Sequence, residues 1–297
     1  MKNRLAFAGI LFFLQFVSPA LADGERFEVS RIAPLPQRAF IGDPRPHMLP
    51  DGEVILGERD IAAAWLTGPT RRYSHGVLGD AIEASGLAVE LANGRHLSLE
   101  LGPGSVFEDR FPRLADLNGD GSDEIILVRS YLDAGAAVAI AGIEDDRLTI
   151  IAESDPIGLP NRWLNPVGAA DFDGDGRTEI AVVRTPHIGG ILMLYRWEKG
   201  KLVEAYRAHG FSNHAMGSRE LGLSAILDAN GDGVPDIVLP DATRRALRIV
   251  TFAGGRFEDV ANFLHQSPIA SVKEIKGKRG IVYALADGST WQVSPKN

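Results

Sequence analysis

Residues 116–128 read DLNGDGSDEIILV, and this stretch decides the fold because the chain contains its pattern three times. The second copy, DFDGDGRTEIAVV, begins at Asp171, and the third copy, DANGDGVPDIVLP, begins at Asp228. Asp171 follows Asp116 by 55 residues, and Asp228 follows Asp171 by 57 residues. A segment that returns at a nearly constant period indicates a repeat architecture, in which each copy belongs to one supersecondary unit.

Each copy carries carboxylate or amide side chains at positions 1, 3, 5 and 9, and glycine at positions 4 and 6. Calcium takes six to eight oxygen ligands at about 2.3–2.6 Å, which alternate residues of a tight loop can supply, whereas magnesium prefers fewer protein ligands. Glycine at position 6 permits a sharp turn, and the carbonyl of position 7 can add a neutral oxygen. The predicted ligands, with position 7 contributing only its backbone carbonyl, are Asp116, Asn118, Asp120, Ser122 and Glu124; Asp171, Asp173, Asp175, Arg177 and Glu179; and Asp228, Asn230, Asp232, Val234 and Asp236.

Two other kinds of loop share part of this pattern. A single DGDG segment is compatible with an ordinary hairpin turn, but three copies at matched spacing favour a metal site. An EF-hand loop requires a bidentate glutamate at position 12, where this chain has Leu127, Val182 and Leu239. These apolar residues belong to predicted strands, so we expect about three structural Ca²⁺ sites outside EF-hands.

The pattern D-x-[DN]-G-D-G-x-x-[DE] followed by an apolar strand resembles the FG-GAP, or VCBS, repeat of integrin α-subunit propellers. The resemblance is clear over about residues 111–264. It implies a β-propeller in which calcium lies between the first and second strands of a blade. The repeats are placed at about 111–164, 165–221 and 222–268.

An all-β propeller of four-stranded blades is therefore the expected fold, with five blades favoured within a range of four to seven. Each repeat contains four apolar segments, two of them almost wholly apolar, as expected for a sheet packed between two neighbours. Degenerate blades are expected at about 47–110 and 269–297. The N-terminal segment FEVSRI (27–32) is expected to pair with the C-terminal strands, which would cover both sheet edges.

The first residues predict export. Lys2 and Arg4 precede an apolar run over 5–17 and a small-residue site at 20–22, which is the pattern of a cleavable secretory signal over 1–22. The run is shorter than the ~20 residues of a membrane-spanning helix. We expect residues 23–297 to form a single domain, periplasmic or secreted, without a membrane span. The absence of cysteine excludes disulfide bonds.

The acidic charge agrees with the predicted loops. Without residues 1–22 the chain would carry 29 basic and 39 acidic residues, which argues against a nucleic-acid partner. Ten of the carboxylates occupy predicted ligand positions, so the acidic excess equals the predicted calcium ligands in number.

The remaining loops suggest a second functional face. In a propeller, the calcium loops and the short turns at 144–147, 198–201 and 253–256 should share one face, and the longer connections the other. Because loops on a rigid scaffold commonly carry recognition, we predict binding of a protein, peptide or glycan there. The candidate residues are Asn161, Arg162, Trp163, Asn165, His187, Asn213, His214, Ser218, Arg219, Glu220 and Arg244. Alternatively, Trp163 caps the core and the polar side chains satisfy only the loop backbone.

Enzymatic interpretations find less support. Ser218 lies in no nucleophile-elbow motif, the histidines form no H-E-x-x-H pair, and no phosphate-binding or dinucleotide fingerprint is present. No catalytic residue is assigned. The alternative function is a carbohydrate-active lyase or hydrolase that uses His187, His214 and Arg219 on the same face, and a purely structural partner of an envelope complex is a third.

Overall fold

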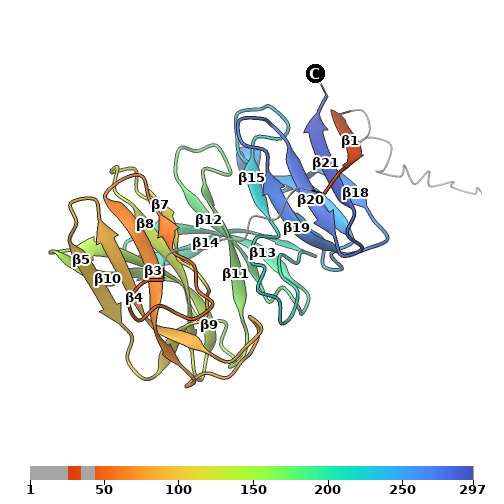
Figure 1. Ribbon diagram of the computed structural model, residues 1–297. Helices are drawn as coiled ribbons and strands as arrows, with labels where there is room; N and C mark the ends of the chain where they lie inside the picture. Colours follow the sequence, from red (N-terminus) through yellow and green to blue (C-terminus); the bar gives the residue numbers. More distant parts are fainter. Residues whose placement is uncertain (1–25, 35–43, 297) are drawn as a thin grey trace, which may run out of the picture.

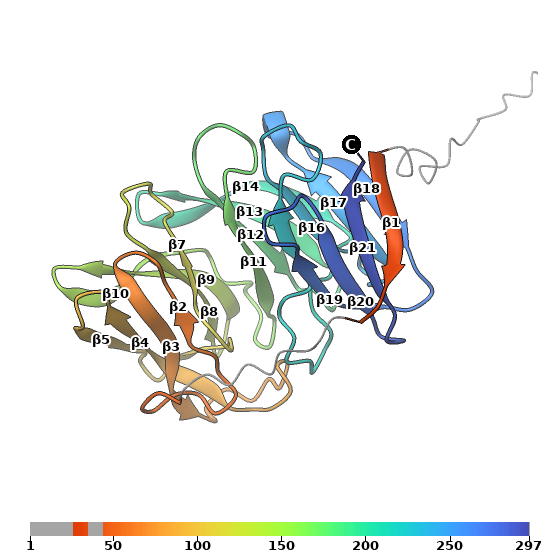
Figure 2. The same cartoon turned by 45° about the horizontal axis from the view of Figure 1, so that its top comes forward.

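The computed structural model describes residues 26–34 and 44–296 of this chain, which are built almost entirely from β-strands. The predicted signal segment, 1–22, lies outside the described residues. No helix in the described ranges has the length and apolar character needed to cross a bilayer. Figures 1 and 2 show the strands as successive small sheets, from the orange N-terminal part to the blue C-terminal part.

The described strands form five antiparallel units of four neighbours, here called units A to E. Unit A contains β2 (Ile55–Leu56), β3 (Ile61–Thr70), β4 (Glu83–Leu91) and β5 (His96–Glu100); unit B contains β7 (Arg113–Ala115), β8 (Glu124–Tyr131), β9 (Gly135–Glu144) and β10 (Arg147–Glu153). Unit C contains β11 (Leu164–Ala170), β12 (Glu179–Arg184), β13 (Ile191–Glu198) and β14 (Lys201–His209); unit D contains β15 (Ala225–Leu227), β16 (Asp236–Pro240), β17 (Ala246–Thr251) and β18 (Glu258–Leu264). Unit E contains β19 (Ile269–Glu274), β20 (Ile281–Leu285), β21 (Thr290–Pro295) and the N-terminal β1 (Phe27–Ile32).

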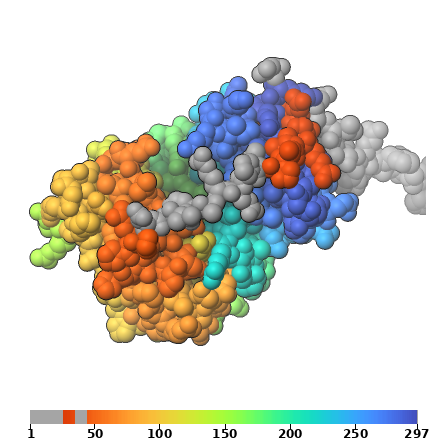
Figure 3. Space-filling view, in the orientation of Figure 1, coloured from red at the N-terminus to blue at the C-terminus, as the bar shows by residue number. Residues whose placement is uncertain are grey.

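The N-terminal strand completes the last unit. All six residues of β1 pair antiparallel with β21, from Phe27 opposite Pro295 to Ile32 opposite Thr290. In Figure 3 the red surface of β1 lies directly against the blue surface of the C-terminal strands. The first and last described strands of the chain therefore belong to one sheet. Each covers a backbone edge of the other that would be unpaired without it.

Short links also join the first three units into one continuous hydrogen-bonded sheet. Strand β6 (Ser105–Phe107) pairs with β4 of unit A and with β8 of unit B. Unit B is joined to unit C by a single parallel pair, Glu153 with Lys201.

The core consists of layers between consecutive units. Alternate residues of a strand point to opposite faces, so Ile125 and Leu127 pack towards unit A while Ile126 and Val128 pack towards unit C. The same alternation places unit D between unit C and unit E. Strands β8, β12 and β16 each begin with a loop carboxylate and continue with an unbroken apolar run, because both faces of each run are covered.

Candidate metal loops and the opposite loop face

The three repeated segments form loops of the same design between the first and second strands of units B, C and D. We call them loop 1 (116–124), loop 2 (171–179) and loop 3 (228–236). In each loop the carboxylate at position 1 accepts hydrogen bonds from the backbone N–H of positions 4 and 6. Asp116 accepts from Gly119 at 2.7 Å and from Gly121 at 3.0 Å, and Asp171 and Asp228 do the same in their loops. Positions 4 and 6 have positive φ throughout, which explains the glycines.

The carboxylate at position 9 is buried beneath each loop. Glu124, Glu179 and Asp236 are 5%, 0% and 0% exposed, and each accepts a hydrogen bond from the backbone N–H of position 2. Burial raises the pKa of all three carboxyl groups, that of Asp236 to about 6. A bound cation would favour their charged forms, so these carboxylates suit metal ligation.

Loops 1 and 3 carry an asparagine at position 3 among their carboxylates. In loop 1 the Asn118 amide donates to Asp120 at 3.0 Å and to Glu124 at 3.1 Å. In loop 3 the Asn230 amide donates to Asp232 at 3.0 Å. These side chains are rich in oxygen, which is the ligand chemistry of calcium.

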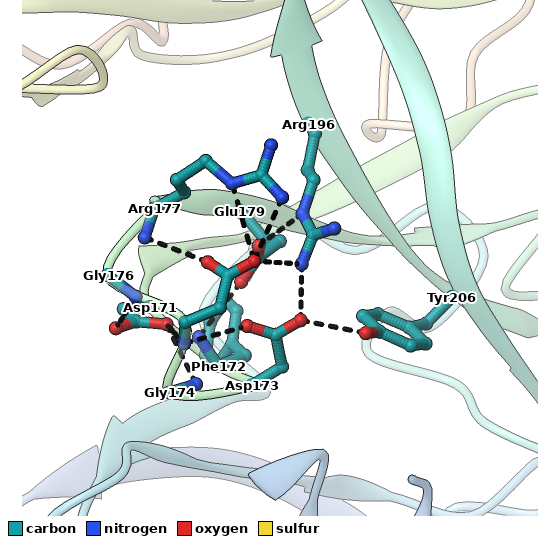
Figure 4. Close-up of polar contacts among 10 residues, drawn as sticks. Asp171, Phe172, Asp173, Gly174, Gly176, Arg177, Glu179, Arg196 and Tyr206 are labelled. Carbon is teal, nitrogen blue, oxygen red and sulfur yellow. Dashed lines mark hydrogen bonds and ion pairs between the residues drawn. The ribbon is translucent and has the colours of Figure 1, made fainter. Parts of the chain in front are cut away.

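Loop 2 has the tightest carboxylate cluster but also contains a cation. Single oxygens of Asp171, Asp173 and Glu179 all lie within 4.8 Å of one another. Figure 4 shows the guanidinium of Arg196, from β13, placed among the loop carboxylates. It pairs with Asp173, with Asp175 at 3.0 Å and with Glu179 at 2.8 Å.

The pKa of Arg196 follows from these contacts. Burial acts against the charged guanidinium, but the hydrogen bond to Glu179 and the charge of Asp173 outweigh it, so the pKa is raised. The hydroxyl of Tyr206 adds a hydrogen bond to Asp173 at 2.7 Å. Sequence reasoning missed Arg196 and Tyr206. The one available signal was the additional carboxylate at position 3 of loop 2, because four clustered carboxylates require a nearby positive charge.

Two cavities open beside loop 1, on the face that carries the metal loops. Their volumes are about 490 and 550 Å³, and both are lined by Asn118 and Trp197. The smaller cavity is also lined by Arg177, Arg196 and Lys199, and the larger one by acidic residues that include Asp120 and Glu144.

On the opposite face, four of the predicted binding residues are buried. Trp163, Asn165, Asn213 and His214 are 2% exposed or less, and the Trp163 indole N–H donates to the carbonyl of Glu108 at 2.9 Å. The amides of Asn165 and Asn213 each donate to the other residue's backbone carbonyl. Of the remaining candidates, Asn161, Arg219 and Glu220 are exposed, and Arg162, His187, Ser218 and Arg244 are half-buried.

The structure brings His187 and His214 together beneath these loops. Their Nε2 and Nδ1 atoms are 2.8 Å apart, and His214 Nε2 lies 2.9 Å from the carbonyl of Ser218. Because that carbonyl only accepts, His214 Nε2 is the donor, and His187 Nε2 donates to His214 Nδ1. Burial is the main cause that lowers the pKa of each imidazole to about 4, so both are neutral at pH 7.

Between units A and B the structure also gathers buried polar groups that no sequence motif indicated. Glu108 is fully buried, lies 2.6 Å from His75 and accepts a hydrogen bond from Ser130. Glu83 is 1% exposed, and burial, followed by the charge of Glu108, raises its pKa to about 9. Only the packing of the two units brings these side chains together.

Comparison with known proteins supports the repeat assignment over part of the chain. Residues 113–182 match the model of the FG-GAP-like repeat, which confirms the resemblance over β7, loop 1, loop 2 and most of β12. No curated protein matches the sequence. Among solved structures, a rhamnogalacturonan lyase PL11 of Bacillus licheniformis is similar with 16% identity and a TM-score of 0.42. The match covers 69% of this chain and 48% of the lyase chain, about half its length.

Proposed function

We propose that this chain is an exported β-propeller of five blades, units A to E, that binds calcium structurally and acts as a recognition module for a protein, peptide or glycan. The observation that carries the proposal is the common geometry of loops 1 and 3, where the carboxylate of position 1 organises the turn and the asparagine of position 3 bonds the carboxylate of position 5. The layered packing from unit A to unit E supports the blade arrangement.

Thermal melting in the presence and absence of calcium tests the metal assignment. Without the ion, the carboxylates in loops 1 and 3 repel one another, so EDTA should lower the Tm, and millimolar calcium should restore it. Asp116→Asn and Asp228→Asn should each reduce the calcium-dependent part of the Tm shift, because each removes the carboxylate that organises its loop. An identical melt in EDTA and in calcium would contradict the assignment.

Recognition is proposed for the loop face opposite the metal loops, through the candidates that are accessible there. A substitution at Trp163, Asn165, Asn213 or His214 would test folding instead of binding, because these side chains are buried. Arg162→Ala is the better probe, since Arg162 is half-buried and its side chain, within the part of the chain that the structure describes, bonds only the carbonyl of the neighbouring Asn161.

The matched control is Arg256→Ala. Arg256 lies next to the turn of unit D that contacts loop 2 through Gly254, and so belongs to the metal-loop face. Binding to a panel of defined polysaccharides and peptides should weaken in Arg162→Ala and persist in Arg256→Ala. The reverse pattern would move recognition to the metal-loop face, where the cavities beside Trp197 lie.

The histidine pair favours one alternative, a lyase or hydrolase. His214 donates from Nε2 to the Ser218 carbonyl, and His187 donates from Nε2 to His214 Nδ1. Because His187 is neutral and its proton is on Nε2, its Nδ1 atom is a hydrogen-bond acceptor on a half-buried ring. Such a nitrogen could take a proton from a substrate as a general base. Turnover of a polysaccharide that is lost in His187→Ala would establish this function over simple binding.

A further inference from the structure

Loop 2 differs from loops 1 and 3 at two places that are far apart in the sequence. At position 3 it has Asp173, where the other loops have Asn118 and Asn230. On the next strand, Arg196 pairs directly with Glu179 in the sheet register.

The matching strand positions in units B and D carry no cation. In unit B, Ile125 pairs with Ala141, so the residue opposite Glu124 is Gly142. In unit D, Ile237 pairs with Val250, so the residue opposite Asp236 is Thr251. Unit C therefore combines an extra acid in the loop with an extra base beside it.

The two differences compensate each other in hydrogen bonding and in charge. In loops 1 and 3 an asparagine amide supplies the N–H group that the carboxylates of positions 5 and 9 need. An ionised Asp173 has no N–H group to donate. Arg196 takes this role: it donates to the carboxylates at positions 3 and 9 and forms an ion pair with the carboxylate at position 5. Counted over the side-chain ligand positions, the four carboxylates of loop 2 together with Arg196 have the same net charge as the three carboxylates of loop 1 or of loop 3. Arg177, at position 7 of loop 2, pairs separately with Asp175 at 3.0 Å.

We infer that Arg196 is the resident cation of loop 2, so that this loop is ordered without calcium and the chain binds two calcium ions, in loops 1 and 3. The inference rests on the proposed function, because it presumes calcium in the other two loops. An asparagine side chain can turn its oxygen towards a metal ion by rotation about one bond. A guanidinium has five donors and no acceptor, so it cannot act as a ligand for the ion. Calcium could enter loop 2 only by displacing Arg196 from three carboxylates.

Tyr206 of unit C and two contacts with unit D hold the arginine-filled loop in place. The Tyr206 hydroxyl bonds Asp173 at 2.7 Å, and the backbone N–H of Gly254 bonds the carbonyl of Asp173 at 3.1 Å. The Arg196 guanidinium lies over the Tyr206 ring at 5.6 Å, and that ring packs against Phe252 of unit D at 5.7 Å. The junction between units C and D is therefore the calcium-independent part of the metal-loop face.

Counting bound calcium tests the inference. Equilibrium dialysis followed by elemental analysis should give two ions per chain for the natural protein. The double variant Asp173→Asn, Arg196→Thr places in unit C both residues that unit D has at these positions, and it should bind three. Adding Asp171→Asn to the double variant should return the count to two, whereas Asp171→Asn alone should leave the natural count at two.

The outcomes separate this inference from the proposed function. Three ions in the natural protein, or two in a double variant that melts cooperatively, would overturn the role of Arg196 while leaving calcium binding intact. No bound calcium in any variant would overturn both. The single variant Arg196→Thr gives an independent readout: its Tm in EDTA should fall below that of the natural protein and recover in calcium.

Discussion

At the scale of single residues, similar loops carry different chemistry because of one or two side chains. Asp173 and Arg196 distinguish loop 2 from its two relatives, although the backbone turn is the same in all three. On the opposite face, Trp163 was considered both as a ligand-binding residue and as a cap on the core. At 2% exposure, packed in the layer between units B and C, it is well placed for the second role.

Glu83 provides a prediction at the residue scale. Because its pKa is raised to about 9 in the folded protein, the folded state holds a proton that the unfolded chain releases near pH 4.5. The stability that this proton contributes is present below about pH 4.5 and is lost as the pH rises towards 9. Glu83→Gln cannot ionise, so its Tm relative to the natural protein should rise between pH 6 and pH 9. An unchanged difference across this range would mean that Glu83 is ionised in the fold.

At the scale of elements, the alternation of side chains across each strand determines which units meet. Strand β8 sends Ile125 and Leu127 to one layer and Ile126 and Val128 to the other, so a single strand serves two interfaces. Its apolar run predicted a strand buried on both faces, and the structure shows that burial pattern. The pairing of FEVSRI with the C-terminal strands was likewise expected from the need to cover sheet edges, and β1 pairs with β21.

Truncation in this strand should be costly. Ile126 is 1% exposed in the layer between units B and C, and Ile126→Ala would leave a cavity there. We expect the free energy of unfolding to fall by about 2–5 kcal/mol, measured by urea denaturation. Leu264→Ala is the control, because Leu264 is 74% exposed and its loss should change stability by less than about 0.5 kcal/mol.

At the scale of the whole molecule, the chain ends are joined by hydrogen bonds and not by a covalent link. The sequence contains no cysteine, so β1 is held to β21 by backbone pairing. The Phe27 ring also packs against Phe263 of unit D, with the ring centroids 6.0 Å apart. The N-terminal strand is therefore needed to complete unit E, although it is far from that unit in the sequence.

Removal of β1 should weaken this end of the molecule first. A chain that begins after residue 32 would expose the edge of β21 and uncover Phe263 in the layer between units D and E. We expect a lower Tm and concentration-dependent association, measured by light scattering, because an unpaired edge strand can pair with another chain. A truncated protein that melts like the natural one and stays monomeric would contradict this role.

The sequence by itself determined the repeated loops and the strand character of the segments around them. Both are specified by residues that are close in the sequence. The turn is specified by acids and glycines within nine residues, and the strand is specified by its apolar run. The tertiary structure alone decided the cation in loop 2, the burial of Trp163 and His214, and the polar cluster around Glu108. Those features depend on which strand lies beside another, and no local pattern specifies the distance between Asp173 and Arg196. Strand pairing within unit C sets that distance, because Arg196 on β13 lies opposite Glu179, the last residue of loop 2, in the sheet register. The burial of Trp163, in contrast, follows from the apolar layer between units B and C.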